Sequence, residues 1–173
     1  MLSAANNKDL RMSYPIEGGE LSMRTFQPYR SALLPLWRFH NVEVATKSSK
    51  DLWERFEDYD DRNDFVGMDM VRKLLQIGMM RTQMKSYFKD RIKYNDEGNV
   101  LPNSEGRQRN QEMDNTSRIF QKYFDYTRTH QGYIAKKKVF MREKRNERRE
   151  KALEKKAEAR RREKHREEQR KDN

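Results

Sequence analysis

Apolar residues recur at helical spacing in three stretches of the middle of the chain. The first predicted helix runs from about Ser49 to Arg62, where Ser48 or Ser49 can cap its start and Leu52, Trp53, Phe56 and Tyr59 share one face. The second, capped by Asp64, covers 65–89, and the third covers 112–130. The second helix has the broadest apolar stripe, so we expect it to be central: Phe65, Met68, Val71, Leu74, Leu75, Gly78 and Met79.

The segments that flank these helices have other patterns. Residues 1–9 are polar and predict a flexible end, while 10–24 predict a hairpin whose turn is Glu17-Gly18-Gly19-Glu20, because glycine supplies the positive φ of such turns. Pro28 and Pro35 exclude a long helix from 26–40, which is apolar enough to be an extended buried segment with room for one short helical turn. Residues 95–110 predict a polar loop. We expect both tryptophans, Trp37 and Trp53, to be largely buried.

The C-terminal part favours helix throughout. From Tyr133 onward there is no Gly or Pro, and Glu, Lys, Arg and Ala dominate. The predicted organisation is therefore a flexible N-terminus at 1–9, a compact core at 10–131 and a basic helical tail at 132–173. The expected fold is mostly α with a small α+β core, an N-terminal hairpin plus about three helices, followed by a long basic helix.

Charge separates the same two parts. The 173 residues carry 39 Lys plus Arg and 28 Asp plus Glu, a formal net charge of +11. Residues 136–173 hold 18 of the bases and 9 of the acids, so the tail alone has a net charge of +9. A polycationic segment of this kind favours phosphate polymers or anionic surfaces. The tail has no apolar face with Trp, Phe or Leu, which disfavours a membrane surface.

The tail charges are also segregated around the predicted helix. At about 100° per residue, Glu143, Glu147, Glu150, Glu154 and Glu158 fall within a stripe of about 80°. Eight bases lie next to this stripe and spread over roughly half of the helix circumference: Lys144, Arg145, Arg148, Arg149, Lys151, Lys155, Lys156 and Arg160. Such a face predicts contacts with a nucleic-acid backbone. The simpler interpretation is a solvated helix held by pairs such as Glu147–Lys151 and Glu158–Arg162, and a protein partner is a third.

A second basic stripe lies at the end of the second predicted helix. Arg81, Lys85 and Lys89 are spaced four residues apart, and Tyr87, Phe88 and Tyr94 are interleaved with further bases. Bases beside aromatic rings suit phosphates and stacked nucleobases. In the ordinary alternative, the aromatic side chains belong to the core and the bases face solvent.

Several functional classes are disfavoured. There is no cysteine, which excludes disulfides and thiolate zinc sites, and no P-loop, G-x-G-x-x-G or G-x-S-x-G motif is present. Asp58 and Asp60 begin a calcium-like pattern that Arg62 interrupts, so we expect no metal and no cofactor. An enzyme is not expected, since it would need His40, Asp64 and Arg72 to converge.

The location expected for the protein follows from two further absences. No apolar run approaches the roughly 18 residues of a membrane span, and the N-terminus has neither an apolar signal core nor an acid-poor presequence. The cytoplasm is therefore expected, with an organelle matrix as the alternative.

The chain resembles an uncharacterised family of small cytosolic proteins labelled "domain of unknown function". Two stretches carry the resemblance: Leu33–Phe39 (LLPLWRF) and Asp64–Gly78 (beginning DFVGMDMVRK). The resemblance covers about 14–122 and implies a family of bacteria, bacteriophages and some eukaryotes. Where that family is typically Arg-rich, at 79–85, this chain keeps only Arg81 and Lys85. The resemblance implies no activity and no catalytic residues, and the tail is an addition to the family pattern.

Together these patterns predict an accessory nucleic-acid-binding protein, with RNA slightly favoured over DNA and a ribonucleoprotein assembly as the expected setting. Affinity would come from counterion release by the tail. The alternative is a protein-interaction adaptor with a charged helical spacer.

Overall fold

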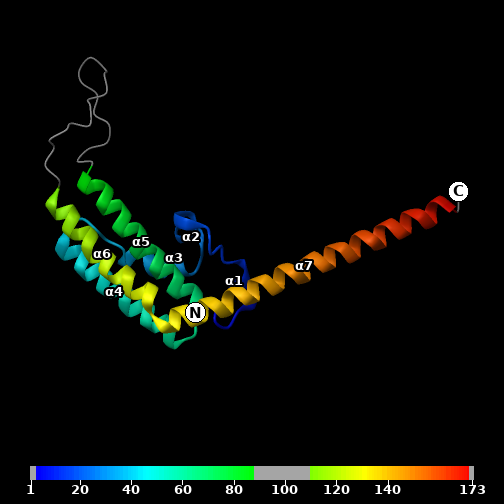
Figure 1. Ribbon diagram of the computed structural model, residues 1–173, viewed down its shortest axis with the longest axis horizontal. Helices are drawn as coiled ribbons and strands as arrows, with labels where there is room; N and C mark the ends of the chain where they lie inside the picture. The colour runs from blue at the N-terminus through cyan, green and yellow to red at the C-terminus, as the bar shows by residue number, and fades with distance from the viewer. Residues whose placement is uncertain (1–2, 88–109, 172–173) are drawn as a thin grey trace, which may run out of the picture. The chain divides into compact units, whose positions relative to one another are not determined.

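The computed structural model describes residues 3–87 and 110–171. Within these ranges every regular element is a helix (Figure 1), so the mostly α prediction is confirmed there and the predicted β component is not found. The elements are α1 (Lys8–Ser13), α2 (Gly19–Thr25), α3 (Tyr29–Leu33), the 3-10 helix η1 (Leu34–Leu36), α4 (Val42–Asp61), α5 (Phe65–Tyr87), α6 (Gln111–Thr129) and α7 (Gln131–Lys171).

Helices α4, α5 and α6 pack side by side and build the core (Figure 1). The first two turns of α5, from Phe65 to Val71, are buried on all sides. Leu52 and Phe56 of α4 and Phe120 of α6 are fully buried against this centre. The prediction of a central second helix is confirmed, because a helix buried all round needs the broad apolar stripe that its sequence has.

Side-chain caps fix where the three core helices begin. The Asp64 carboxylate accepts a hydrogen bond from Gly67 N at 3.1 Å, as its position before α5 predicts. Asn41 caps α4 through Val44 N at 2.8 Å, so this helix begins at Val42, and the expected caps Ser48 and Ser49 are buried within it. Asn110 caps α6 through Met113 N at 3.2 Å. The rest of the polar loop predicted at 95–110 lies outside the described residues.

The N-terminal hairpin prediction is wrong. Residues 10–24 form parts of α1 and α2, and Asn7 caps α1 by accepting from Leu10 N at 2.8 Å. Gly19 has the positive φ of 51°, yet it starts α2 instead of turning a hairpin. Met12 and Tyr14 are both buried because α1 ends at Ser13 and Tyr14 is extended. Buried residues two positions apart therefore occur here without a β-strand. A short apolar run does not by itself distinguish a strand from a short helix.

Part of the segment predicted to be a flexible end contacts the core. Ala4 is fully buried, and its N–H donates to the Tyr29 hydroxyl at 2.8 Å. The proline-containing segment at 26–40 holds α3 and η1 instead of one extended stretch. The prediction for the tryptophans holds in part, because Trp37 and Trp53 are both mostly covered but neither is fully buried.

The chain divides into two compact units, Met1–Ile134 and Ala135–Asn173. Helix α6 ends at Thr129, and His130 is extended between α6 and α7. The His130 Nδ1 atom accepts from Tyr133 N at 3.4 Å in the first turn of α7. Gly132 lies inside the first turn of α7.

Candidate nucleic-acid interface

The predicted basic face of the tail lies on α7, within the unit that begins at Ala135. A continuous helix through residue 171 keeps the spacing of about 100° per residue, so the glutamate stripe and the eight bases occupy different sides of it. Between Lys144 and Arg160 this face extends for about 24 Å along the helix axis. Seven of the eight bases are exposed: Arg145, Arg148, Arg149, Lys151, Lys155, Lys156 and Arg160.

Two ion pairs foreseen by the solvated-helix interpretation are present. Lys151 Nζ lies 2.6 Å from Glu147 Oε1, and Arg162 pairs with Glu158. Exposed pairs of this kind contribute only about 0.3–0.5 kcal/mol each. Among the eight predicted bases, these two ion pairs include only Lys151. The Lys144 Nζ atom lies 5.9 Å from the centre of the Phe140 ring. Burial lowers the pKa of Lys144, although the Glu147 charge acts against this.

The α5 stripe has a different setting from the one its sequence suggests. Arg81 is partly buried and pairs with Glu20 of α2, and its guanidinium lies 5.4 Å from the centre of the Trp37 ring. Lys85 is exposed, with its Nζ 5.1 Å from the Phe39 ring centre. Lys89 lies outside the described residues. The aromatic rings that accompany Arg81 and Lys85 thus come from the LLPLWRF stretch.

Arg81 also lines a groove of about 250 Å³ that the sequence did not predict. The lining comes from α2, from the start of η1 and the two residues that follow η1, and from α5. It holds three guanidinium groups and one carboxylate, with Trp37 as the aromatic wall: Glu20, Met23, Arg24, Leu34, Trp37, Arg38 and Arg81. No pattern of neighbouring residues marks the groove, because its bases come from three separate segments.

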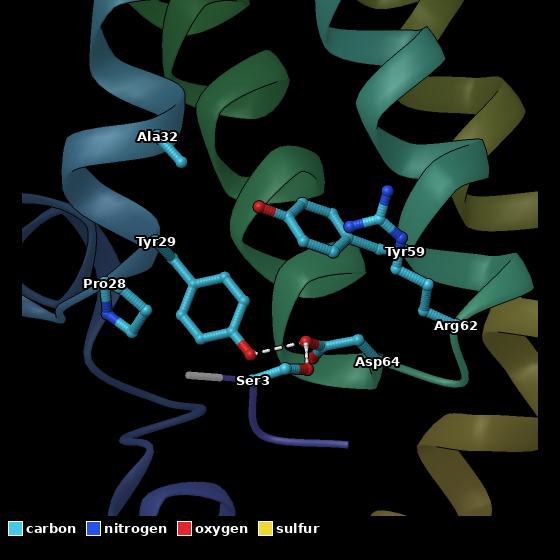
Figure 2. A pocket seen from close by; sticks show the side chains of 7 residues that line it. All are labelled: Ser3, Pro28, Tyr29, Ala32, Tyr59, Arg62 and Asp64. Atoms are coloured by element: carbon cyan, nitrogen blue, oxygen red, sulfur yellow. Dashed lines mark hydrogen bonds between the residues drawn. The ribbon is translucent and has the colours of Figure 1, made fainter. Parts of the chain in front are cut away.

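A smaller pocket of about 60 Å³ lies beside Asp64. Figure 2 shows the Ser3 and Tyr29 hydroxyls pointing at the Asp64 carboxylate, to which they donate at 2.5 and 2.6 Å. Tyr59 and Arg62 also line it, but His40 and Arg72 do not. The convergence of His40, Asp64 and Arg72 that an enzyme would need is therefore not found at this pocket. The carboxylate instead joins the N-terminal residues to the start of α5.

A second buried carboxylate, Asp69, is the centre of a charged cluster. Its two oxygens accept from Tyr14 and Tyr133 at 2.6 and 2.8 Å. Arg72 Nε donates to it at 2.9 Å, and Lys73 Nζ lies 3.5 Å away. Because these partners occupy the fully buried Asp69 carboxylate, the cluster holds the N-terminal segment and the first turn of α7 to α5.

The electrostatics of this cluster follow from burial and the two cations. Burial raises the pKa of Asp69, but Arg72, Lys73 and the Tyr14 hydrogen bond outweigh it, so the pKa lies below its usual value. Burial, together with the Asp69 charge, raises the pKa of both Tyr14 and Tyr133. Burial lowers the pKa of Lys73, which attraction to Asp69 only partly offsets. The sequence gives no sign of this cluster, because Asp69 and Tyr14 are far apart along the chain.

Metal ions and membranes are two further partners to consider. Among the side chains that the structure describes, no three of His, Asp or Glu gather as they would around a metal ion. Among the helices of the same ranges, none combines the length and apolar character needed to cross a bilayer.

Comparison with known proteins gives one match. No curated protein and no solved structure matches the chain. A family model described as "Domain of unknown function (DUF4385)" matches residues 2–144, a wider range than the resemblance seen in the sequence. Of the eight bases of the tail, Lys144 alone falls inside this range. Arg81, Lys85 and every residue that lines the groove fall inside it. With most of its length matched, the chain belongs to the DUF4385 family.

Proposed function

We propose that the chain is an accessory nucleic-acid-binding protein of the cytoplasm, which contacts phosphate backbones through the basic face of α7. The observation that carries this proposal is the segregation of charge on an exposed helix. Seven bases of the face are open to solvent, and the glutamates lie on a separate stripe. Placing like charges together costs repulsion, which a polyanion lying along the face would remove.

The chemistry of the face suits a backbone better than a particular base sequence. Flexible Lys and Arg side chains on a straight helix can reach phosphates, but no aromatic or amide group accompanies them between Lys144 and Arg160, apart from Asn146. Binding should therefore be insensitive to sequence. RNA is slightly favoured over DNA, and the setting we favour is a ribonucleoprotein assembly.

A charge swap tests the face directly. Exchanging Arg148 and Glu150 keeps composition and net charge but puts an acid on the basic side and a base on the acidic stripe. We expect the swapped full-length chain to bind a fluorescent single-stranded RNA several-fold more weakly near physiological salt. The matched control exchanges Glu163 and Arg166, which lie in α7 beyond the ordered pattern. Equal binding by all three chains would show that the tail acts only as a polycation.

A second candidate is the protein-interaction adaptor, which one feature of α5 favours. Met80, Met84 and Tyr87 are exposed by 48, 60 and 56%, and their spacing places them on one side of the helix. An exposed apolar row of this kind suits a protein partner. Complexes formed through it should persist at high salt, whereas binding through the α7 face should be lost. Pull-down from cells with and without nuclease, at low and high salt, separates the two candidates.

A further inference from the structure

The groove between α2, the LLPLWRF stretch and α5 has an excess of positive charge in a confined space. Its lining has three guanidiniums, from Arg24, Arg38 and Arg81, against the single carboxylate of Glu20, which leaves a formal charge of +2. Its volume of about 250 Å³ is just below the usual range for small-molecule sites. The groove can thus hold a compact anion with a small attached group, in contrast to the open face of α7.

The guanidiniums are held in place from within the fold. Glu20 Oε1 pairs with Arg81, and Arg24 Nη1 lies 3.6 Å from the same oxygen. Arg38 donates through Nη1 to the carbonyls of Leu34 and Trp37 at 3.2 and 3.1 Å. Each guanidinium carries five N–H donors in a planar fork, so these contacts leave further donors for a ligand. These contacts order the guanidiniums in part, while the exposed Arg24 and Arg38 side chains keep the freedom to adjust to an anion.

The aromatic wall is fixed in the same way. The Trp37 ring lies under Arg81 and packs against Phe39 with ring centres 5.0 Å apart. A Cβ added at Gly78 would come within 3.1 Å of Trp37 Nε1, so the indole rests on bare backbone of α5. The packing against Phe39 and α5 fixes the position of the ring, and its partial burial leaves some of its surface accessible. The ring can therefore contact the sugar or base that carries an anion.

The net charge discriminates between kinds of phosphate. An internal phosphodiester carries a charge of −1, whereas a phosphate monoester carries about −1.5 to −2 at neutral pH and has three acceptor oxygens. The monoester matches the +2 of the groove and can accept from more than one guanidinium fork. We propose that this groove binds the phosphate monoester of a nucleotide, either free or at the end of a nucleic-acid strand. The strand-end form rests on the proposed function.

End-labelled ligands test this with the full-length chain. One arm compares a short RNA bearing a 5′-phosphate, the same RNA with a 5′-hydroxyl, and the same RNA with a 3′-phosphate, each labelled at the opposite end. The other arm compares adenosine 5′-monophosphate with adenosine by calorimetry. We expect a phosphate monoester to strengthen binding about tenfold or more in at least one arm, because charge-assisted hydrogen bonds to guanidiniums are strong.

Matched variants tie the effect to the groove. The double variant Arg24→Gln/Arg38→Gln changes two exposed side chains and should lose the preference for the monoester. Arg30→Gln, an exposed arginine of α3 outside the groove lining, should keep it. A preference that survives in the double variant, or no preference for a monoester in either arm, would overturn the proposal.

The two arms also separate this proposal from the function proposed for α7. Exchange of Arg148 and Glu150 should weaken the phosphorylated and unphosphorylated RNAs alike and leave their ratio unchanged. If neither RNA binds but adenosine 5′-monophosphate does, the function proposed for α7 fails while the groove proposal stands with a free nucleotide as ligand. If the phosphorylated and unphosphorylated RNAs bind equally, and neither adenosine nor adenosine 5′-monophosphate binds, the groove proposal fails while the function proposed for α7 stands.

Discussion

Replacing Gly67 by Ala tests the closest approach of α4 and α5. A Cβ at this position would lie 2.4 Å from two carbon atoms of the Tyr59 ring, far inside the usual 3.5–4.0 Å separation of carbon atoms. Overpacking of a core costs about 1–3 kcal/mol, and the severity of this contact favours the upper end. Alanine in a helix returns about 1 kcal/mol relative to glycine. We therefore expect Gly67→Ala to lower the free energy of unfolding by about 2 kcal/mol.

The assay is urea unfolding of four chains followed by circular dichroism: wild type, Gly67→Ala, Tyr59→Ala and the double variant. With the Tyr59 ring removed, the same Gly67→Ala change should stabilise by about 1 kcal/mol through helix propensity alone. The coupling free energy between the two positions should then be about 3 kcal/mol. If Gly67→Ala stabilises the wild-type chain, or if the two changes are additive, the close packing of α4 on α5 is refuted.

Three further predictions concern the Asp69 cluster and the limits of the folding unit. Asp69→Asn leaves the buried Lys73 and the partly buried Arg72 without their counterion and should cost about 3–5 kcal/mol at neutral pH. Because the folded pKa of Asp69 is lowered, its contribution to stability is fully present above the unfolded pKa of about 3.9 and is lost as the pH falls through the folded pKa. A pH series of urea titrations should therefore show the difference between wild type and variant shrinking as the pH falls below about 3.9, and a constant difference would refute the assignment. Tyr133→Phe removes one donor to this carboxylate and should cost about 1.5–3 kcal/mol in urea unfolding, whereas an unchanged midpoint would mean that the hydrogen bond is not formed. A chain that ends at Lys144, where the family match ends, should keep a cooperative thermal transition, and a broad transition would make the rest of α7 part of the folding unit.

The sequence predicts the three core helices well because each buries a face of regular spacing. Asp64 shows its role in sequence, since a carboxylate directly before an apolar run caps a helix. The hairpin fails because Met12, Tyr14 and two glycines fit a strand pair and a pair of short helices equally well. Trp53 is only partly buried although it lies beside Phe56 on α4, since the edge of an apolar stripe stays near solvent.

The two candidate sites differ in how far the sequence predicts them. The face of α7 depends on local spacing alone, so its residues can be named from the sequence. The groove needs Glu20, Trp37 and Arg81 to meet, which only the tertiary packing of α2 and the LLPLWRF stretch on α5 brings about. Arg81 itself could be predicted as a basic residue near aromatic rings, but the identity of those rings could not.

The salt dependence of RNA binding tests the central claim most directly. If all eight bases of the α7 face met phosphates, log K would fall against log salt with a slope of roughly −6 to −7. A straight helix follows a curved backbone over a limited length, so we expect about half of these contacts and a slope of about −3 on single-stranded RNA. Exchange of Arg148 and Glu150 should make the slope shallower. A slope near zero, or no binding of RNA or DNA near physiological salt, would contradict the account and leave the adaptor function in its place.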